Sequence, residues 1–96
     1  MNHQSFRTTV SCHARTHIFV ADQWFRVEEV DRQEGDRTAL VVTKRGEGLR
    51  LYGRNFVEGE RTELFPDVFL TVTDVSKRSK VRLCIEVLPD TKISCR

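Results

Sequence analysis

The stretch "VRLCIEVLPDTKISCR", from Val81 to Arg96, carries the pattern that decides the fold class. Apolar and polar residues alternate from Val81 to Val87, "LPD" follows, and a second alternation ends on Arg96. Alternation with a period of two is typical of a half-buried β-strand, and a proline followed by aspartate is typical of a turn. This part of the chain therefore predicts two short strands joined by a turn.

The same pattern continues back along the chain. No long segment has the apolar spacing of a helix, whereas short β-rich runs are separated by Gly, Pro, Asp and Ser turn signals. We therefore expect an all-β fold, a small antiparallel sheet or barrel of short strands in one domain, residues 1–96. The expected strands lie within His17–Gln23, Trp24–Val30, Arg37–Thr43, Leu49–Arg54, Val68–Val75, Lys80–Val87 and Thr91–Arg96, with a weaker candidate at Ser5–Cys12.

Composition is that of a globular protein. Of the 96 residues, 39% are hydrophobic and 31% are charged, which excludes a disordered chain. No apolar run reaches the ~18 residues of a membrane span, and the N-terminal stretch does not look like a secretory signal, so we expect a cytoplasmic protein. With 16 Lys and Arg against 14 Asp and Glu, a basic face requires that charges of one sign gather on one side.

Residues 21–32 align without gaps with residues 66–77, pairing Trp24 with Phe69 and Val27 with Val72. Farther on, "LVVT" (40–43) aligns with "LCIE" (83–86), and "LRLYGR" (49–54) with "TKISCR" (91–96). One interpretation is a duplication, with repeats at 17–54 and 55–96. The other is the general similarity of any two strand–turn–strand segments.

The second half of the chain resembles the carbon storage regulator family of bacterial mRNA-binding proteins. "VRLCIEVLPDTKISCR" follows the family's strand, turn and final strand ending in arginine, and "VEGE", "ELFPD", "VFLTVTDV" and "LRLYGR" follow its earlier elements in order. The similarity covers residues 49–96 and extends weakly to 17–54. The chain departs from the family by one extra residue before Pro89, by "SKRSK" in place of a glycine-rich turn, by Cys84 in place of glycine, and by the absence of the family's C-terminal helix.

The resemblance implies a fold and a function. Members of the family fold as intertwined homodimers of five-stranded chains, and their first and last strands together grip single-stranded, GGA-containing loops of mRNA leaders. It therefore implies an RNA-binding post-transcriptional regulator without a cofactor, acting as a homodimer or as a single-chain pseudo-dimer. A pseudo-dimer would have one strand missing or shared, because "LRLYGR" both ends the first repeat and can open the second.

The resemblance also implies site residues. Arg96 takes the place of the family's RNA-contacting arginine, and the strand that ends in Arg54 is expected on the same surface. The alternatives are that these arginines are solvated strand ends, that the charged turn after Asp74 only confers solubility, and that Tyr52 is half-buried rather than stacked on a base. The candidate RNA-binding residues are Arg96, Arg54, Leu88, Pro89, Arg50, Tyr52, Lys77, Arg78 and Lys80.

Other chemistry is weakly indicated. "CHARTH" places Cys12, His13 and His17 together, but a structural zinc site needs four ligands, so we expect no metal site. The carboxylates near residues 28–36 read as a solvated hairpin, and no nucleophile motif or phosphate-binding glycine loop occurs, so we do not expect an enzyme. The residues expected in the core include Trp24, Phe25, Phe65, Phe69 and Cys84, while Cys95 is expected to be exposed.

Two further interpretations stay open. The altered turn at 76–80 and the nearly balanced charge fit a protein-interaction module that has kept the fold but lost RNA binding, either an antagonist of a regulator or an assembly subunit. The second interpretation is a generic small β-barrel whose strand pattern matches that of the family by chance.

Overall fold

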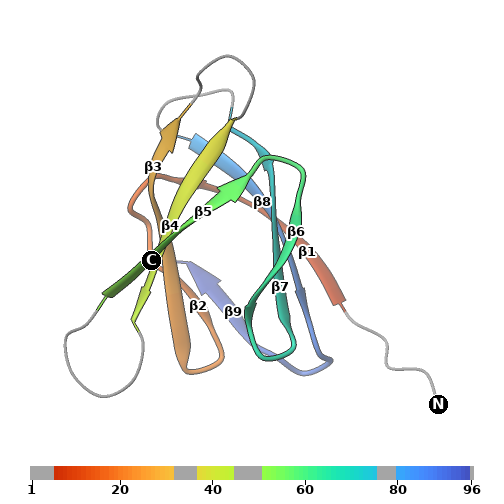
Figure 1. Cartoon of the computed structure of the whole chain (residues 1–96). Helices are drawn as coiled ribbons and strands as arrows, with labels where there is room; N and C mark the ends of the chain where they lie inside the picture. The colour runs from red at the N-terminus through yellow and green to blue at the C-terminus, as the bar shows by residue number, and fades with distance from the viewer. Residues whose placement is uncertain (1–5, 32–36, 45–50, 76–79, 96) are drawn as a thin grey trace.

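The computed structural model describes residues 6–31, 37–44, 51–75 and 80–95. Over these residues the chain is all-β, as expected, and its nine strands form two antiparallel sheets that enclose one core (Figure 1). The described residues contain no helix, and therefore none long and apolar enough to cross a membrane.

Sheet A has four strands in the order β1-β8-β7-β6, all antiparallel. Its edge strand β1 pairs with β8 over eight residues, from Phe6 opposite Val87 to His13 opposite Lys80. Three of its strands, β6, β7 and β8, follow one another in the chain and form a meander. The strands are β1 (Phe6–His13), β8 (Lys80–Val87), β7 (Val68–Asp74) and β6 (Arg61–Phe65).

Sheet B has five strands in the order β5-β4-β3-β2-β9. Strands β2 to β5 form a continuous meander, and the last strand of the chain, β9, returns from sheet A to pair with β2. The two edges of sheet B are therefore β5 and β9. The strands are β5 (Leu51–Val57), β4 (Thr38–Lys44), β3 (Gln23–Asp31), β2 (Ile18–Val20) and β9 (Ile93–Cys95).

The two sheets share one strand order. The first four strands of sheet B lie in the order β5-β4-β3-β2, and the corresponding strands of sheet A lie in the order β1-β8-β7-β6. Sheet B has a fifth strand, β9, next to β2, which has no described counterpart in sheet A. A register shift between Val27 and Glu29 in β3 recurs 45 residues later, between Val72 and Asp74 in β7. This arrangement is the one expected from two copies of a four-stranded unit, and duplication remains our hypothesis for its origin.

The core lies between the sheets and is built from alternate strand residues. Phe25 and Phe65 are buried, as expected, whereas Trp24 and Phe69 are only half-buried because the neighbouring residues Phe25, Val68 and Leu70 face inward. The expectation of a core position for Trp24 and Phe69 is therefore wrong. Cys84 was also expected in the core but is half-buried, because it alternates with the inward-facing Leu83 and Ile85. The residues that cluster in the core are Cys12, Ile18, Val20, Phe25, Val27, Ala39, Val41, Phe56, Phe65, Val68, Leu70, Val72, Val75, Val81, Leu83, Ile85 and Val87.

Candidate nucleic-acid interface

Exposed apolar side chains gather where β1 begins and β8 ends. Phe6 lies opposite Val87, and Leu88 is the next residue after Val87, so the two side chains belong to the same end of the molecule. Phe6 is 58% exposed and Leu88 is 41% exposed, which is unusual for side chains of their size. We call this region the first corner; it comprises Phe6, Arg7, Leu88, Pro89 and Lys92.

The turn between β8 and β9 is held by backbone hydrogen bonds. The Thr91 N–H donates to the Leu88 carbonyl at 3.3 Å, and the Ala21 N–H donates to the Lys92 carbonyl at 2.8 Å. Asp90 adopts a φ of 68°, a left-handed conformation that aspartate tolerates better than most residues. The loop is thus tied to the β2–β3 turn, and Leu88 and Pro89 are presented on an ordered support.

The first corner joins the edges of both sheets, because β1 is an edge strand of sheet A and β9 is an edge strand of sheet B. The two strands also approach each other away from this corner, at the far end of β1, where Cys12 lies opposite Val81. Burial raises the pKa of the Cys12 thiol in β1, and the nearby Cys95 thiol in β9 raises the pKa of Cys12 further. Edge strands offer backbone donors and acceptors to a partner, and no further described strand pairs with the outer edge of β1 or of β9.

The Cys12 and Cys95 thiols should differ in reactivity. Cys12 is buried with a raised pKa, whereas Cys95 is exposed, so a thiol reagent at about pH 8 is expected to modify Cys95 at least about tenfold faster than Cys12. Mass spectrometry of a labelling time course measures both rates in the folded wild-type protein. Denatured protein, in which the two rates should converge, is the control. Equal rates in the folded protein would contradict the close packing of β1 against the core.

A second corner lies along the edge strand β5. All five residues from Leu51 to Asn55 are exposed, and among them Leu51 and Tyr52 are large and about half-exposed. Arg54 lies 5.6 Å above the Phe56 ring and donates a long hydrogen bond, 3.5 Å, to the Glu63 carbonyl of β6. The second corner contains a hollow of about 170 Å³ that is lined by Val41, Thr43, Tyr52, Gly53, Arg54 and Leu64.

The structure separates residues that the sequence interpretation put on one surface. Tyr52 and Arg54 lie on β5, while Leu88 and Pro89 precede β9, and β4, β3 and β2 lie between these two edges of sheet B. Lys80 lies at the other end of β8, opposite His13. The expectation of one continuous surface is therefore wrong for the described residues. Arg50, Lys77, Arg78 and Arg96 lie outside the described residues.

Phe6 and Arg7 were missed by the interpretation of the sequence. The segment "FRTTVSCH" contains many polar residues, so its strand pattern is weak, and only Cys12 in it is buried. The alternation of Val10 and Cys12 with polar residues was the available signal, but the pairing with β8 is what makes this segment an edge strand.

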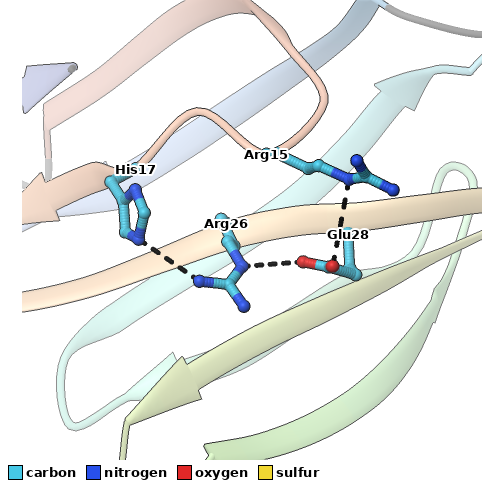
Figure 2. Close-up of polar contacts among 4 residues, drawn as sticks. All are labelled: Arg15, His17, Arg26 and Glu28. Atoms are coloured by element: carbon cyan, nitrogen blue, oxygen red, sulfur yellow. Dashed lines mark hydrogen bonds and ion pairs between the residues drawn. The ribbon is translucent and has the colours of Figure 1, made fainter.

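A polar cluster covers part of the outer face of sheet B (Figure 2). The Arg26 Nε lies 2.7 Å from a Glu28 carboxylate oxygen, and Arg15 approaches the other oxygen of Glu28 at 3.9 Å. His17 Nε2 lies 3.3 Å from Arg26 Nη1, and the His17 ring meets Trp24 edge-on with a centroid distance of 4.8 Å. Two arginines share one carboxylate here, so the cluster carries a net positive charge.

His17, one of the three metal-competent residues of "CHARTH", belongs to this cluster. The His17 Nε2 atom lies 3.3 Å from the Arg26 guanidinium, which repels a cation rather than helping to bind one. Among the residues that the structure describes, no group of three or more His, Cys, Asp or Glu side chains is placed to hold a metal ion.

The outer face of sheet A has its own charge cluster. Glu86 is 5% exposed, and its carboxylate oxygens lie 2.8 Å from Arg61 Nε and 3.9 Å from Arg7 Nε. The Arg61 guanidinium also stacks 3.8 Å above the Phe69 ring. The hydrogen bond from Arg61 lowers the pKa of the Glu86 carboxyl, although burial acts in the opposite direction, and the charges of Arg61 and Arg7 lower it further.

Glu86 should make stability depend on acid pH. Since its pKa is lower in the folded protein than the ordinary 4.5, ionised Glu86 stabilises the fold above that value, and the contribution is lost as the pH falls through the folded-state pKa. Glu86→Gln is expected to lower the free energy of unfolding at neutral pH, and this difference from wild type is expected to disappear at an acid pH below the folded-state pKa of Glu86. Urea unfolding at both pH values measures this, with Glu63→Gln as the exposed control. A wild-type advantage of equal size at both pH values would contradict the assignment.

The first corner thus combines an exposed aromatic ring, an exposed apolar turn, two cations and two open strand edges. Stacking surfaces, backbone hydrogen-bonding groups and positive charge are the features that recognise unpaired bases of RNA. The resemblance to the carbon storage regulator family rests on the sequence pattern alone, since no protein-family model, no curated protein and no solved structure matches this chain.

Proposed function

We propose that this protein binds single-stranded RNA at its first corner and acts as a post-transcriptional regulator of the carbon storage regulator type. The observation that carries the proposal is the exposure of Phe6 and Leu88 beside Arg7 and Lys92, where the edges of the two sheets meet.

Each of these residues has a distinct role in the proposal. The Phe6 ring offers a stacking surface to one base. The backbone around Leu88 and Pro89 offers hydrogen-bonding groups that can read the edges of an unpaired base. Arg7 is available for a phosphate because its side chain is 73% exposed and its contact with Glu86 is long, at 3.9 Å.

The strand order supports the same proposal. The resemblance implies a site in which the first and last strands lie together at an edge and grip RNA. Here β1 and β9 are the first and last described strands, and they start 87 residues apart, at Phe6 and Ile93. They come together because Phe6 lies opposite Val87 at the end of β8, and residues 88–92 lead from there to β9. In this proposal the chain is a single-chain pseudo-dimer that acts in the cytoplasm. It has one complete RNA site, because the second corner has no described equivalent of β9.

The test is binding of the purified protein to a short hairpin RNA with GGA in its loop, beside the same hairpin with a changed loop, at low and near-physiological salt. The proposal expects binding that depends on the loop and persists at the higher salt. Equal binding to both hairpins that disappears with salt would indicate only a cationic surface. Absence of binding at both salt concentrations would overturn the proposal.

A second candidate function is a protein-interaction module without RNA binding. The observation that favours it is the outer edge of β6, where no described strand pairs although the equivalent edge of sheet B carries β9. This candidate expects no RNA binding in the hairpin experiment and a stable complex with a protein.

A further inference from the structure

The two sheets differ at one edge. In sheet B, β9 pairs with β2, placing Ile93 opposite Val20, and Ile93 packs half-buried against the core. The equivalent of β2 in sheet A is β6, and β6 pairs only with β7 among the described residues. Over the residues that the structure describes, sheet A therefore ends at β6, at the place where sheet B has one strand more.

The backbone of β6 has hydrogen-bonding groups that face away from the sheet. The Val72 carbonyl of β7 accepts a hydrogen bond from the Gly59 N–H at 2.8 Å, so the backbone groups of Val72 point toward β6. Because this direction alternates along a strand, the backbone groups of Leu70 also point toward β6. Leu70 lies opposite Thr62, so Arg61 and Glu63 direct their backbone groups outward. The Glu63 carbonyl agrees with this, because it accepts from the Arg54 side chain of the neighbouring sheet.

A hollow lies beside this edge. It is the hollow of the second corner, about 170 Å³, and Leu64 of β6 forms one wall while Val41, Tyr52 and Arg54 of sheet B form others. A strand added to β6 would pass this hollow and could place one apolar side chain in it, as β9 places Ile93 against the core in the other corner. The Arg54 side chain is exposed and its hydrogen bond to β6 is long, so little opposes its displacement.

The charges beside the edge favour a basic occupant. Glu60 and Glu63 are exposed, and neither makes an ion pair with any residue that the structure describes, whereas Arg61 is held by Glu86. The strand β9 shows the complementary pattern, since Lys92 precedes the half-buried Ile93.

We propose that the outer edge of β6 is an acceptor site for a β-strand from another protein. The occupant has the pattern of β9: an apolar residue that enters the hollow, polar residues that alternate with it, and basic residues at its flanks. It pairs with the outward backbone groups of Arg61 and Glu63 and extends sheet A to five strands. This site lies at the second corner and does not depend on the RNA site at the first.

The experiment uses the full chain and a synthetic peptide with the sequence of residues 88–96, in which Ser replaces Cys95. Titration followed by backbone amide NMR is expected to give saturable shifts at Arg61, Glu63 and Leu64, with a Kd below about 1 mM. Glu63→Pro removes one outward N–H and is expected to weaken binding about tenfold or more. The matched variant Glu63→Thr keeps the N–H, loses only the exposed charge and is expected to change Kd by about threefold or less.

Other outcomes decide the proposal as well. A peptide of the same composition in scrambled order is expected not to bind. If thermal unfolding shows that Glu63→Pro does not fold, Leu64→Gln, which places an amide in the wall of the hollow, is expected to weaken binding about tenfold. Absence of shifts at β6, or shifts at Phe19 and Val20 because the peptide displaces β9 from β2, would overturn the proposal. Phe6→Ala should leave peptide binding unchanged, so this test fails or succeeds independently of the RNA proposal.

Discussion

Phe25→Ala is expected to lower the free energy of unfolding by about 3–5 kcal/mol, the range found when a buried phenylalanine is truncated. Phe25 is 0% exposed and lies in β3, the central strand of sheet B, with its ring in the core between the sheets. Truncation removes apolar contacts and leaves a cavity that the strands on either side cannot close. Because a domain of this size is stable by only about 5–15 kcal/mol, the variant should lose a large part of its stability.

Urea unfolding measures this loss, and a thermal scan should show a Tm lower by more than about 10 °C. The matched control is Phe6→Ala, which removes the same side chain from a position that is 58% exposed. The control is expected to change the free energy of unfolding by no more than about 0.5 kcal/mol. Losses of similar size in both variants would contradict the assignment of Phe25 to the core and Phe6 to the surface.

Phe6→Ala is also expected to weaken RNA binding by about 5- to 150-fold, if the proposed RNA site is correct. The range follows from the roughly 1–3 kcal/mol that stacking of one base on an aromatic ring contributes. The measurement is a titration of the GGA-loop hairpin at constant salt, because the phosphate contribution to affinity changes steeply with ionic strength. The stability control above shows that loss of affinity does not come from unfolding.

Tyr52→Ala is the matched variant at the second corner, since Tyr52 is also an exposed aromatic residue on an edge strand. It is expected to change RNA affinity by less than about twofold, within the usual range for a surface substitution. A larger loss from Tyr52→Ala than from Phe6→Ala would move the RNA site to β5, where the sequence resemblance alone had put part of it. Loss from neither variant would exclude stacking at both corners.

The two proposals assign different tasks to the two corners. At the first corner, β9 adds a fifth strand to sheet B, and the corner presents exposed side chains beside the edge strands β1 and β9. At the second corner, no described strand completes sheet A, and a hollow remains beside β6. In these two proposals the chain binds RNA at one corner and a protein strand at the other. Phe6→Ala tests the first activity, and Glu63→Pro tests the second.

Much of the local structure was predictable because strand alternation and turn chemistry act over a few residues. The segments Trp24–Val30, Arg37–Thr43, Val68–Val75 and Lys80–Val87 each became a strand within one or two residues of the expected bounds. The all-β class followed from these segments together. The weak segment Ser5–Cys12 became a full strand as well, because β8 supplies eight partners for its backbone.

The pattern of the sequence was enough to predict most of the strands, though not β6, and the turns between them, since these depend on side-chain alternation and turn residues within a few positions. Only the tertiary structure decided that Trp24 and Phe69 face outward beneath arginines, that Phe6 lies opposite Val87 next to Leu88, and that Tyr52 and Arg54 lie at the opposite edge of sheet B. The physical reason is that strand order and the choice of face depend on pairing between segments far apart in the chain, which no local pattern specifies.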